Sequence, residues 1–152
     1  MFFGLLNIEP LFLLRCGKWS VLDAPVGSRG SGLMHHKFVV IDRTVVLTGS
    51  ANFTRSGMHG DANRPKTRGN VNHILRFQSS ELAELFEQEF HTMWGDGPGG
   101  KQNSRFGLQK GSTGLNTAMV GQTRVDVLFA PHRKRDPNHG LNWIEKQLSK
   151  AH

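Results

Sequence analysis

Six residues whose types could bind and attack a phosphate ester lie at fixed spacing in one short segment. Residues 35–52 read HHKFVVIDRTVVLTGSAN and fit the pattern His, one residue, Lys, four residues, Asp, six residues, Gly-Ser, one residue, Asn. The matching positions are His35, Lys37, Asp42, Gly49, Ser50 and Asn52. A neutral imidazole is a competent nucleophile, an ammonium can neutralise charge on phosphate oxygens, and hydroxyl and amide groups donate hydrogen bonds. The segment therefore predicts phosphodiester chemistry that requires neither a metal nor another cofactor.

Two apolar runs must position these residues. Residues 37–41 read KFVVI and residues 44–48 read TVVLT, with only Asp42 and Arg43 between them, which predicts a tight hairpin of strands. Both runs are apolar on successive residues, so both faces of the sheet should be covered. The expected fold class is α/β, with an α-β-α sandwich.

The hairpin explains the spacing of the motif. His35 and Lys37 are two residues apart on an extended strand, so their side chains leave the same face about 7 Å apart and can reach one phosphate. The second strand returns to that end, where Gly49 lets the backbone turn and brings Ser50 and Asn52 alongside. Asp42 falls in the hairpin turn, where a structural role is favoured over a direct part in the reaction.

The remainder of the first half supplies further elements. Residues 58–70 have the composition of an exposed loop, and a third strand is expected at about 71–77. Ser79 or Ser80 can cap a helix that runs to Trp94, with apolar residues every three or four positions and Gly95 at its end.

The second half is less regular. Residues from Gly95 to Gly121 are rich in glycine, serine, asparagine and lysine and are expected to form a linker or loop. A strand at 123–129 and a helix at 141–151 follow. We therefore expect a lobe at 1–94, a linker at 95–122, and at 123–152 the start of a second lobe.

The motif from His35 to Asn52 resembles that of the phospholipase D superfamily, which includes phospholipases, phospholipid synthases and nucleases. The resemblance implies a phospholipase D-like α-β-α lobe, here incomplete at its beginning. It also implies that His35 forms a covalent phosphohistidine, that Asp42 belongs to the catalytic motif, and that Lys37, Ser50 and Asn52 hold the phosphate.

The chain departs from the family pattern in two ways that concern the site. Family active sites combine two copies of the motif, and this chain has one, so the second must come from a homodimer partner or from a second lobe. On the third strand, Asn72 stands where single-motif nucleases carry a glutamate that orients the catalytic histidine. Asn72 and Gly49 are therefore supporting residues of the expected site.

Composition leaves the substrate open between a phospholipid and a nucleic acid. The formal charge of +7 favours a polyanionic partner, as does the basic run at residues 132–135, although a solvated loop explains that run too. The apolar opening at residues 1–14 contains Glu9 and Pro10 and predicts neither a signal peptide nor a transmembrane helix. A cytoplasmic location is favoured. Phospholipid is slightly preferred as the substrate, and hydrolysis is not distinguished from transfer to an alcohol.

Of three other interpretations, one is rejected and two remain. His36, His59 and His73 could be imagined around a metal with His35, but their spacing is unlike that of zinc ligands, so no metal is expected. The chain could be an inactive fragment or a phosphate-binding module without catalysis. It could also be a basic nucleic-acid-binding protein.

Overall fold

The computed structural model describes residues 35–58, 63, 64, 66, 69–95, 103, 105 and 109–151. Its elements are β1 (Phe38–Ile41), β2 (Val45–Gly49), α1 (Arg55–Met58), β3 (Ile74–Gln78), α2 (Ser80–Trp94), β4 (Leu115–Val120), β5 (Thr123–Leu128) and α3 (Gly140–Leu148). Helices and strands are mixed, and the α/β class expected from the sequence is confirmed.

The hairpin of β1 and β2 forms as predicted. Asp42 and Arg43 have φ angles of 49° and 54°, and positive φ at both central residues is the conformation of a type I′ turn, whose twist matches that of the strands. The turn is closed by a hydrogen bond of 3.0 Å from the Thr44 amide to the Ile41 carbonyl oxygen.

β3 pairs antiparallel with β2 and completes a sheet of order β1-β2-β3. The strand begins at Ile74, three residues later than expected. Gly49 is the last residue of β2 and lies opposite Ile74, so the residues before Ile74 have no strand residue beside them. Val71 is accordingly fully exposed.

α2 confirms the expected helix and its boundaries. The Ser79 hydroxyl accepts a hydrogen bond of 3.2 Å from the Leu82 amide, which satisfies one of the free amides of the first turn. At the other end Gly95 adopts a φ of 58°, and its amide donates to the His91 carbonyl oxygen at 2.8 Å. A glycine tolerates this positive φ without strain.

The sequence predicted a loop up to Gly121, and this prediction is wrong for the last part of the segment, because residues 115–120 form β4. This strand pairs with β5 through a two-residue turn in which Val120 lies opposite Thr123 and Gly121 has a φ of 62°. β5 therefore pairs with β4, the strand that precedes it in the sequence. A glycine in a two-residue connection between apolar runs is a hairpin signal, which the polar and glycine-rich surroundings obscured.

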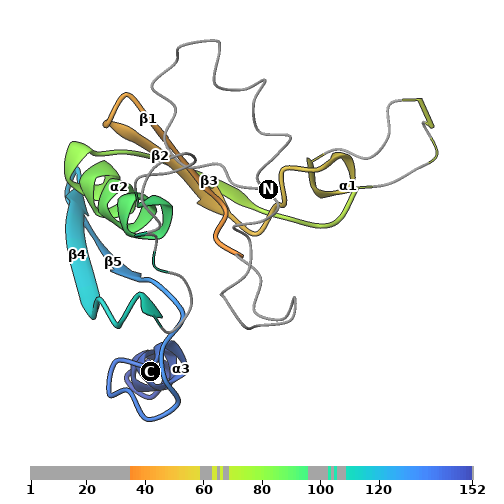
Figure 1. Cartoon of the computed structure of the whole chain (residues 1–152). Coiled ribbons are helices and arrows are strands. Elements are labelled where there is room, and N and C mark those ends of the chain that lie inside the picture. Colours follow the sequence, from red (N-terminus) through yellow and green to blue (C-terminus); the bar gives the residue numbers. More distant parts are fainter. Residues whose placement is uncertain are drawn as a thin grey trace.

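One core joins the two sheets. α2 lies between the three-stranded sheet and the β4-β5 hairpin (Figure 1), and the core includes Phe38 from β1, Phe86 from α2 and Ala118 from β4. Val39 and Val45, which face away from α2, are also buried, each 8% exposed. Both faces of the hairpin are therefore covered, as predicted. The assignment of residues 123–152 to a second lobe stays a prediction.

α3 follows β5 and lies at the C-terminal end of the described chain (Figure 1). None of its residues is buried. Among the described residues, no helix combines the length and the apolar character needed to cross a bilayer.

Candidate active site

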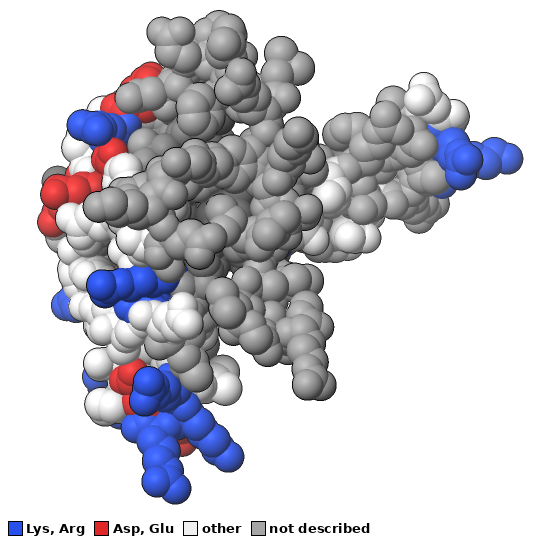
Figure 2. Space-filling view, in the orientation of Figure 1, with Lys and Arg blue, Asp and Glu red and all other residues white. Residues whose placement is uncertain are grey.

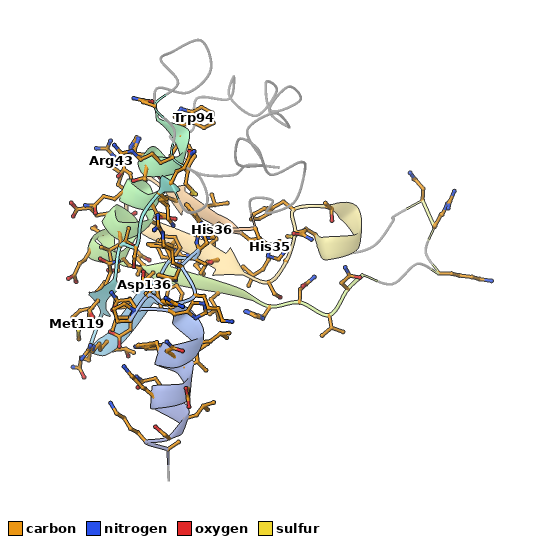
Figure 3. All side chains as sticks on the ribbon, turned by 60° about the horizontal axis from the view of Figure 1, so that its bottom comes forward. His35, His36, Arg43, Trp94, Met119 and Asp136 are labelled. Carbon is orange, nitrogen blue, oxygen red and sulfur yellow. The ribbon has the colours of Figure 1, made fainter. Side chains whose placement is uncertain are left out.

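The two ends of the motif meet at the open end of the β1-β2 hairpin. The register places Phe38 opposite Thr48, so the residues just before β1 lie beside those that end β2. The Thr48 hydroxyl donates to the Lys37 carbonyl oxygen at 3.1 Å and ties the two strands there. Figure 3 shows His35 and His36 at this end, with Arg43 at the opposite end.

Gly49 is required by the close approach of β3. A Cβ atom at this position would lie 2.1 Å from the His73 carbonyl oxygen, which is a steric overlap with backbone. The same oxygen accepts a hydrogen bond of 3.1 Å from the Ser50 amide, and the His73 amide donates to Ser50 Oγ at 3.1 Å. The close contact at Gly49 therefore fixes both the backbone and the hydroxyl of Ser50.

Asn72 links Ser50 to the helix α1. The Ser50 hydroxyl donates to Asn72 Oδ1 at 3.0 Å, and Asn72 Nδ2 donates to the Gly57 carbonyl oxygen at 2.9 Å. Among the described residues, the side-chain hydrogen bonds of Asn72 reach Ser50, Gly57 and Asn70, and none reaches His35. Asn72 thus orients Ser50. The Ser50 hydroxyl has one proton, so it must break its hydrogen bond to Asn72 before it can donate a hydrogen bond to a phosphate.

Asn52 lies in the exposed loop between β2 and α1. Its carbonyl oxygen accepts a hydrogen bond of 2.8 Å from the Thr54 amide, and a Cβ atom on Gly57 would lie 2.1 Å from that oxygen. Thr54 Oγ1 accepts from the Gly57 amide at 3.1 Å. These contacts form a compact turn that holds Asn52 two residues beyond Ser50.

His35 and Lys37 lie at the start of β1. The His35 side chain is exposed, and Lys37 Nζ donates to the His35 carbonyl oxygen at 2.8 Å. Desolvation by burial lowers the pKa of Lys37 below its usual 10.5. A bound phosphate anion would act against this lowering, because a nearby negative charge favours the ammonium form.

The structure does not bring Asp42 to the other motif residues. Asp42 is in the turn that joins β1 to β2, at the far end of the hairpin from His35 and Ser50. Its positive φ of 49° suits aspartate better than most residues, because a short polar side chain tolerates the left-handed region. Its place in the turn explains why an aspartate is found at residue 42, and a role in the reaction is not needed to explain it.

A buried polar cluster lies directly behind His35. His36 is half-buried against Phe129, with ring centroids 5.9 Å apart, and its Nδ1 atom lies 3.5 Å from Glu89 Oε1. Glu89 is paired with the ammonium of Lys110, and both side chains are 1% exposed. Lys110 also donates to the Ala130 carbonyl oxygen at 2.8 Å.

Electrostatics in this cluster keep His36 neutral. Burial, followed by the charge of Lys110, lowers the pKa of His36 from 6.5 to about 4. Burial raises the pKa of Glu89, and the bond from Lys110 opposes this change. The residue after His35 is thus a neutral imidazole that packs beside a buried ion pair.

Sequence reasoning did not identify this cluster or the supporting role of Gly57. His36 was considered as a metal ligand and rejected as one, and Glu89 and Lys110 are separated by 20 intervening residues that carry no recognisable motif. An acidic residue on the apolar face of α2 was the available signal, since carboxylates are almost never buried unless paired. Among the described residues, no three histidine, cysteine, aspartate or glutamate side chains gather as metal ligands would; His59 lies outside the described residues.

The chain is similar to proteins of one family. A family profile described as "Cardiolipin synthase, PLD-like domain" matches residues 17–94, half of the chain. The mitochondrial cardiolipin hydrolase of Xenopus tropicalis is 39% identical over 66 residues, which cover 43% of this chain and 27% of that protein. The Mus musculus protein of the same name is 33% identical over 63 residues, covering 41% and 24%, and the Homo sapiens protein is 33% identical over 63 residues, covering 41% and 21%.

The chain spans about a quarter of the length of these curated relatives. No solved structure matches it. The profile match includes the hairpin, the loop after it, β3 and α2, and so contains the six motif residues and Asn72, whereas Lys110 of the buried cluster lies outside it.

Proposed function

Because this chain belongs to the phospholipase D-like family, we propose that it is a phosphodiester hydrolase in which His35 is the nucleophile. The observation that carries the proposal is the hairpin register, which pairs Phe38 with Thr48 and so brings the start and the end of the motif to one place. In this proposal the exposed imidazole, the lysine, the hydroxyl and the amide bind one phosphate together.

The reaction has two displacements. The lone pair of neutral His35 forms a bond to phosphorus, the bond from phosphorus to the leaving oxygen breaks, and a general acid gives that oxygen a proton. Water then attacks the phosphohistidine, its proton passes to the same group, and the bond from nitrogen to phosphorus breaks. The products are an alcohol and a phosphate monoester.

Lys37, Ser50 and Asn52 bind the phosphate in this mechanism. The Lys37 ammonium neutralises the non-bridging oxygens as charge develops, and the Ser50 hydroxyl and Asn52 amide donate hydrogen bonds. Loss of such a positioned donor or cation costs about a hundredfold to a thousandfold in turnover. Asp42 maintains the turn.

The general acid is a second histidine from another copy of the motif. The chain has one copy, so a homodimer partner, or a second lobe, supplies the group that protonates the leaving oxygen and then activates water. No cofactor takes part. The two roles require two imidazoles close to one phosphate, so activity should depend on assembly.

A phospholipid diester is the favoured substrate. The relatives in Xenopus, mouse and human are named mitochondrial cardiolipin hydrolases, and cardiolipin is an anionic phospholipid with two phosphodiesters. The excess of positive charge, +7, suits either such a lipid or a nucleic acid. Nucleic-acid diesters are the alternative substrate for the same site.

A second candidate function is a phosphate-binding module without turnover. It is favoured by Asn72, whose Oδ1 accepts the hydrogen bond that the Ser50 hydroxyl donates, and which stands where single-motif family nucleases carry a glutamate. An amide cannot stabilise an imidazolium as a carboxylate does.

The test is hydrolysis of a chromogenic phosphodiester in excess chelator by the purified chain, with native mass measured on the same sample. His35→Ala should abolish turnover, and His91→Ala, which removes an exposed histidine of α2, is the matched control. Turnover that vanishes in His35→Ala supports the hydrolase. A folded dimer that binds inorganic phosphate without turnover would establish the binding module instead.

A further inference from the structure

α3 exposes a stripe of three aliphatic side chains. Leu141, Ile144 and Leu148 follow one another at spacings of three and four residues and are 68%, 47% and 69% exposed. This spacing places them on one side of the helix, while Trp143 faces the other side and is half-buried. Aliphatic groups held together on one exposed face mark a contact surface more often than single exposed residues do.

A basic run lies immediately before this helix. Arg133, Lys134 and Arg135 are all exposed. Figure 2 shows long basic side chains extending from the end of the molecule where Figure 1 places α3 and the loop before it. Among the described residues, no acidic side chain forms an ion pair with these three. Their charges are therefore available to an external anion.

The loop and the helix form one unit. The Asp136 amide donates to the Arg133 carbonyl oxygen at 2.8 Å, and the Asp136 carboxylate accepts from the Asn138 amide at 2.8 Å. His139 Nδ1 accepts from the Leu141 amide at 3.3 Å and caps the helix. The Asp136 carboxylate, which follows the basic run in sequence, thus accepts a backbone hydrogen bond, and the cations and the aliphatic stripe lie at the same end of the molecule.

We propose that this end of the chain, residues 133–148, docks on an anionic phospholipid surface. The aliphatic stripe would enter the boundary between headgroups and acyl chains, and the three cations would lie among lipid phosphates. Each surface cation contributes about fivefold to binding at an anionic bilayer, and a helix of two to three turns adds a modest apolar contribution. The contact is therefore reversible rather than an anchor.

Two other binding partners, a nucleic acid and a second copy of this chain, would each be complementary to one part of the surface. A nucleic acid would engage the basic run but leave Leu141 and Leu148 in water. A second copy of the chain could bury the stripe in a symmetric pair, but it would bring two basic runs together, and like charges repel. Of these three binding partners, a lipid surface is the one that satisfies both the cations and the aliphatic groups.

The inference goes beyond the proposed hydrolase, because docking does not use the chemistry of His35. Flotation of the full chain carrying His35→Ala should show binding to vesicles of equimolar phosphatidylcholine and phosphatidylglycerol. Little should bind to phosphatidylcholine alone, and salt should weaken the interaction. Because this variant cannot turn over, failure of docking and failure of the hydrolase are separate results.

Two sets of substitutions test the basic run and the aliphatic stripe separately. Replacing Arg133, Lys134 and Arg135 by Gln should weaken binding about a hundredfold. Leu141→Gln with Leu148→Gln should weaken it at least about tenfold, and Gln keeps the helix propensity of Leu. Both sites are exposed, so the fold should survive, as circular dichroism would show.

The matched control removes three cations elsewhere by changing Arg64, Lys66 and Arg76 to Gln. Its affinity for vesicles should stay within about threefold of that of the parent, which is a difference of about 0.6 kcal/mol in binding free energy. Equal weakening by this control would overturn the proposal, because net charge alone would explain binding. Absence of vesicle binding would overturn it as well. Binding of a DNA duplex that the leucine variants leave unchanged, without vesicle binding, would assign the basic run to nucleic acid.

Discussion

His36 Nδ1 lies 3.5 Å from Glu89 Oε1, and the same carboxylate is paired with Lys110, so three titratable side chains meet one residue away from His35. Glu89 and Lys110 are 1% exposed. The residue next to the proposed nucleophile therefore packs beside a buried ion pair that joins α2 to the segment before β4.

Lys110→Met should destabilise the fold by about 3–5 kcal/mol, because it leaves the Glu89 charge buried without its partner. Adding Glu89→Leu should recover most of this loss, since apolar residues can replace a buried ion pair at little cost. Urea unfolding of the parent, the two single variants and the double variant measures the coupling free energy. Additive losses would show that the two side chains do not interact.

The neutral state of His36 predicts a pH dependence of stability. Its folded-state pKa of about 4 lies below the usual histidine pKa of 6.5, so between these two pH values the unfolded chain binds more protons than the folded chain. The free energy of unfolding should therefore fall by up to about 3 kcal/mol as pH drops from 6.5 toward 4, with the full contribution present above pH 6.5.

His36→Gln should remove this part of the pH dependence. Burial raises the pKa of Glu89, which acts in the opposite sense and remains in both proteins, so the difference between parent and variant isolates His36. Urea unfolding across this pH range is the measurement, and His91→Gln controls for the loss of one histidine. A slope unchanged by His36→Gln would contradict the buried, neutral imidazole.

Gly49→Ala should disrupt the site through the backbone. Its Cβ atom would overlap the His73 carbonyl oxygen at 2.1 Å, so β2 and β3 must separate at the point where Ser50 is fixed. We expect a loss of about 1–3 kcal/mol in stability and a larger fractional loss of turnover. Gly140→Ala is the matched control, because its nearest contact, Leu128 Cδ2, is at an ordinary 3.6 Å. Chemical unfolding and diesterase assays on both variants test this.

The sequence predicted the elements whose signals are local. The β1-β2 hairpin follows from successive apolar residues around a two-residue turn, and α2 follows from a serine cap, a helical period and Gly95. β4 was missed because its apolar residues are interrupted by polar ones, and its pairing with β5 decides its conformation.

The site was predictable to a similar degree. The motif spacing identified the residues at the open end of the hairpin, but contacts between distant segments carry no local pattern. Asn72 was expected to act beside His35, whereas its hydrogen bonds go to Ser50 and Gly57. The pairing of Glu89 with Lys110 depends on how a later segment packs against α2, and no spacing rule encodes it.

Asn72→Ala tests whether Ser50 must be oriented. The substitution removes the acceptor of the Ser50 hydroxyl and the donor to the Gly57 carbonyl oxygen. Each such bond contributes about 1 kcal/mol, so kcat/KM for a phosphodiester should fall about tenfold if the proposed phosphate contact of Ser50 depends on them.

Asn70→Ala is the control, because Asn70 takes part in this network through its carbonyl oxygen, which the substitution retains. A rise in KM with unchanged kcat would place Ser50 in ground-state binding of the phosphate, whereas an equal fall in kcat and kcat/KM would place its hydrogen bond in the transition state. Should Asn72→Ala turn over like the parent, Asn72 would be a link between the loop and α1 without influence on the phosphate, and orientation of Ser50 would rest on the His73 amide, which donates to it at 3.1 Å.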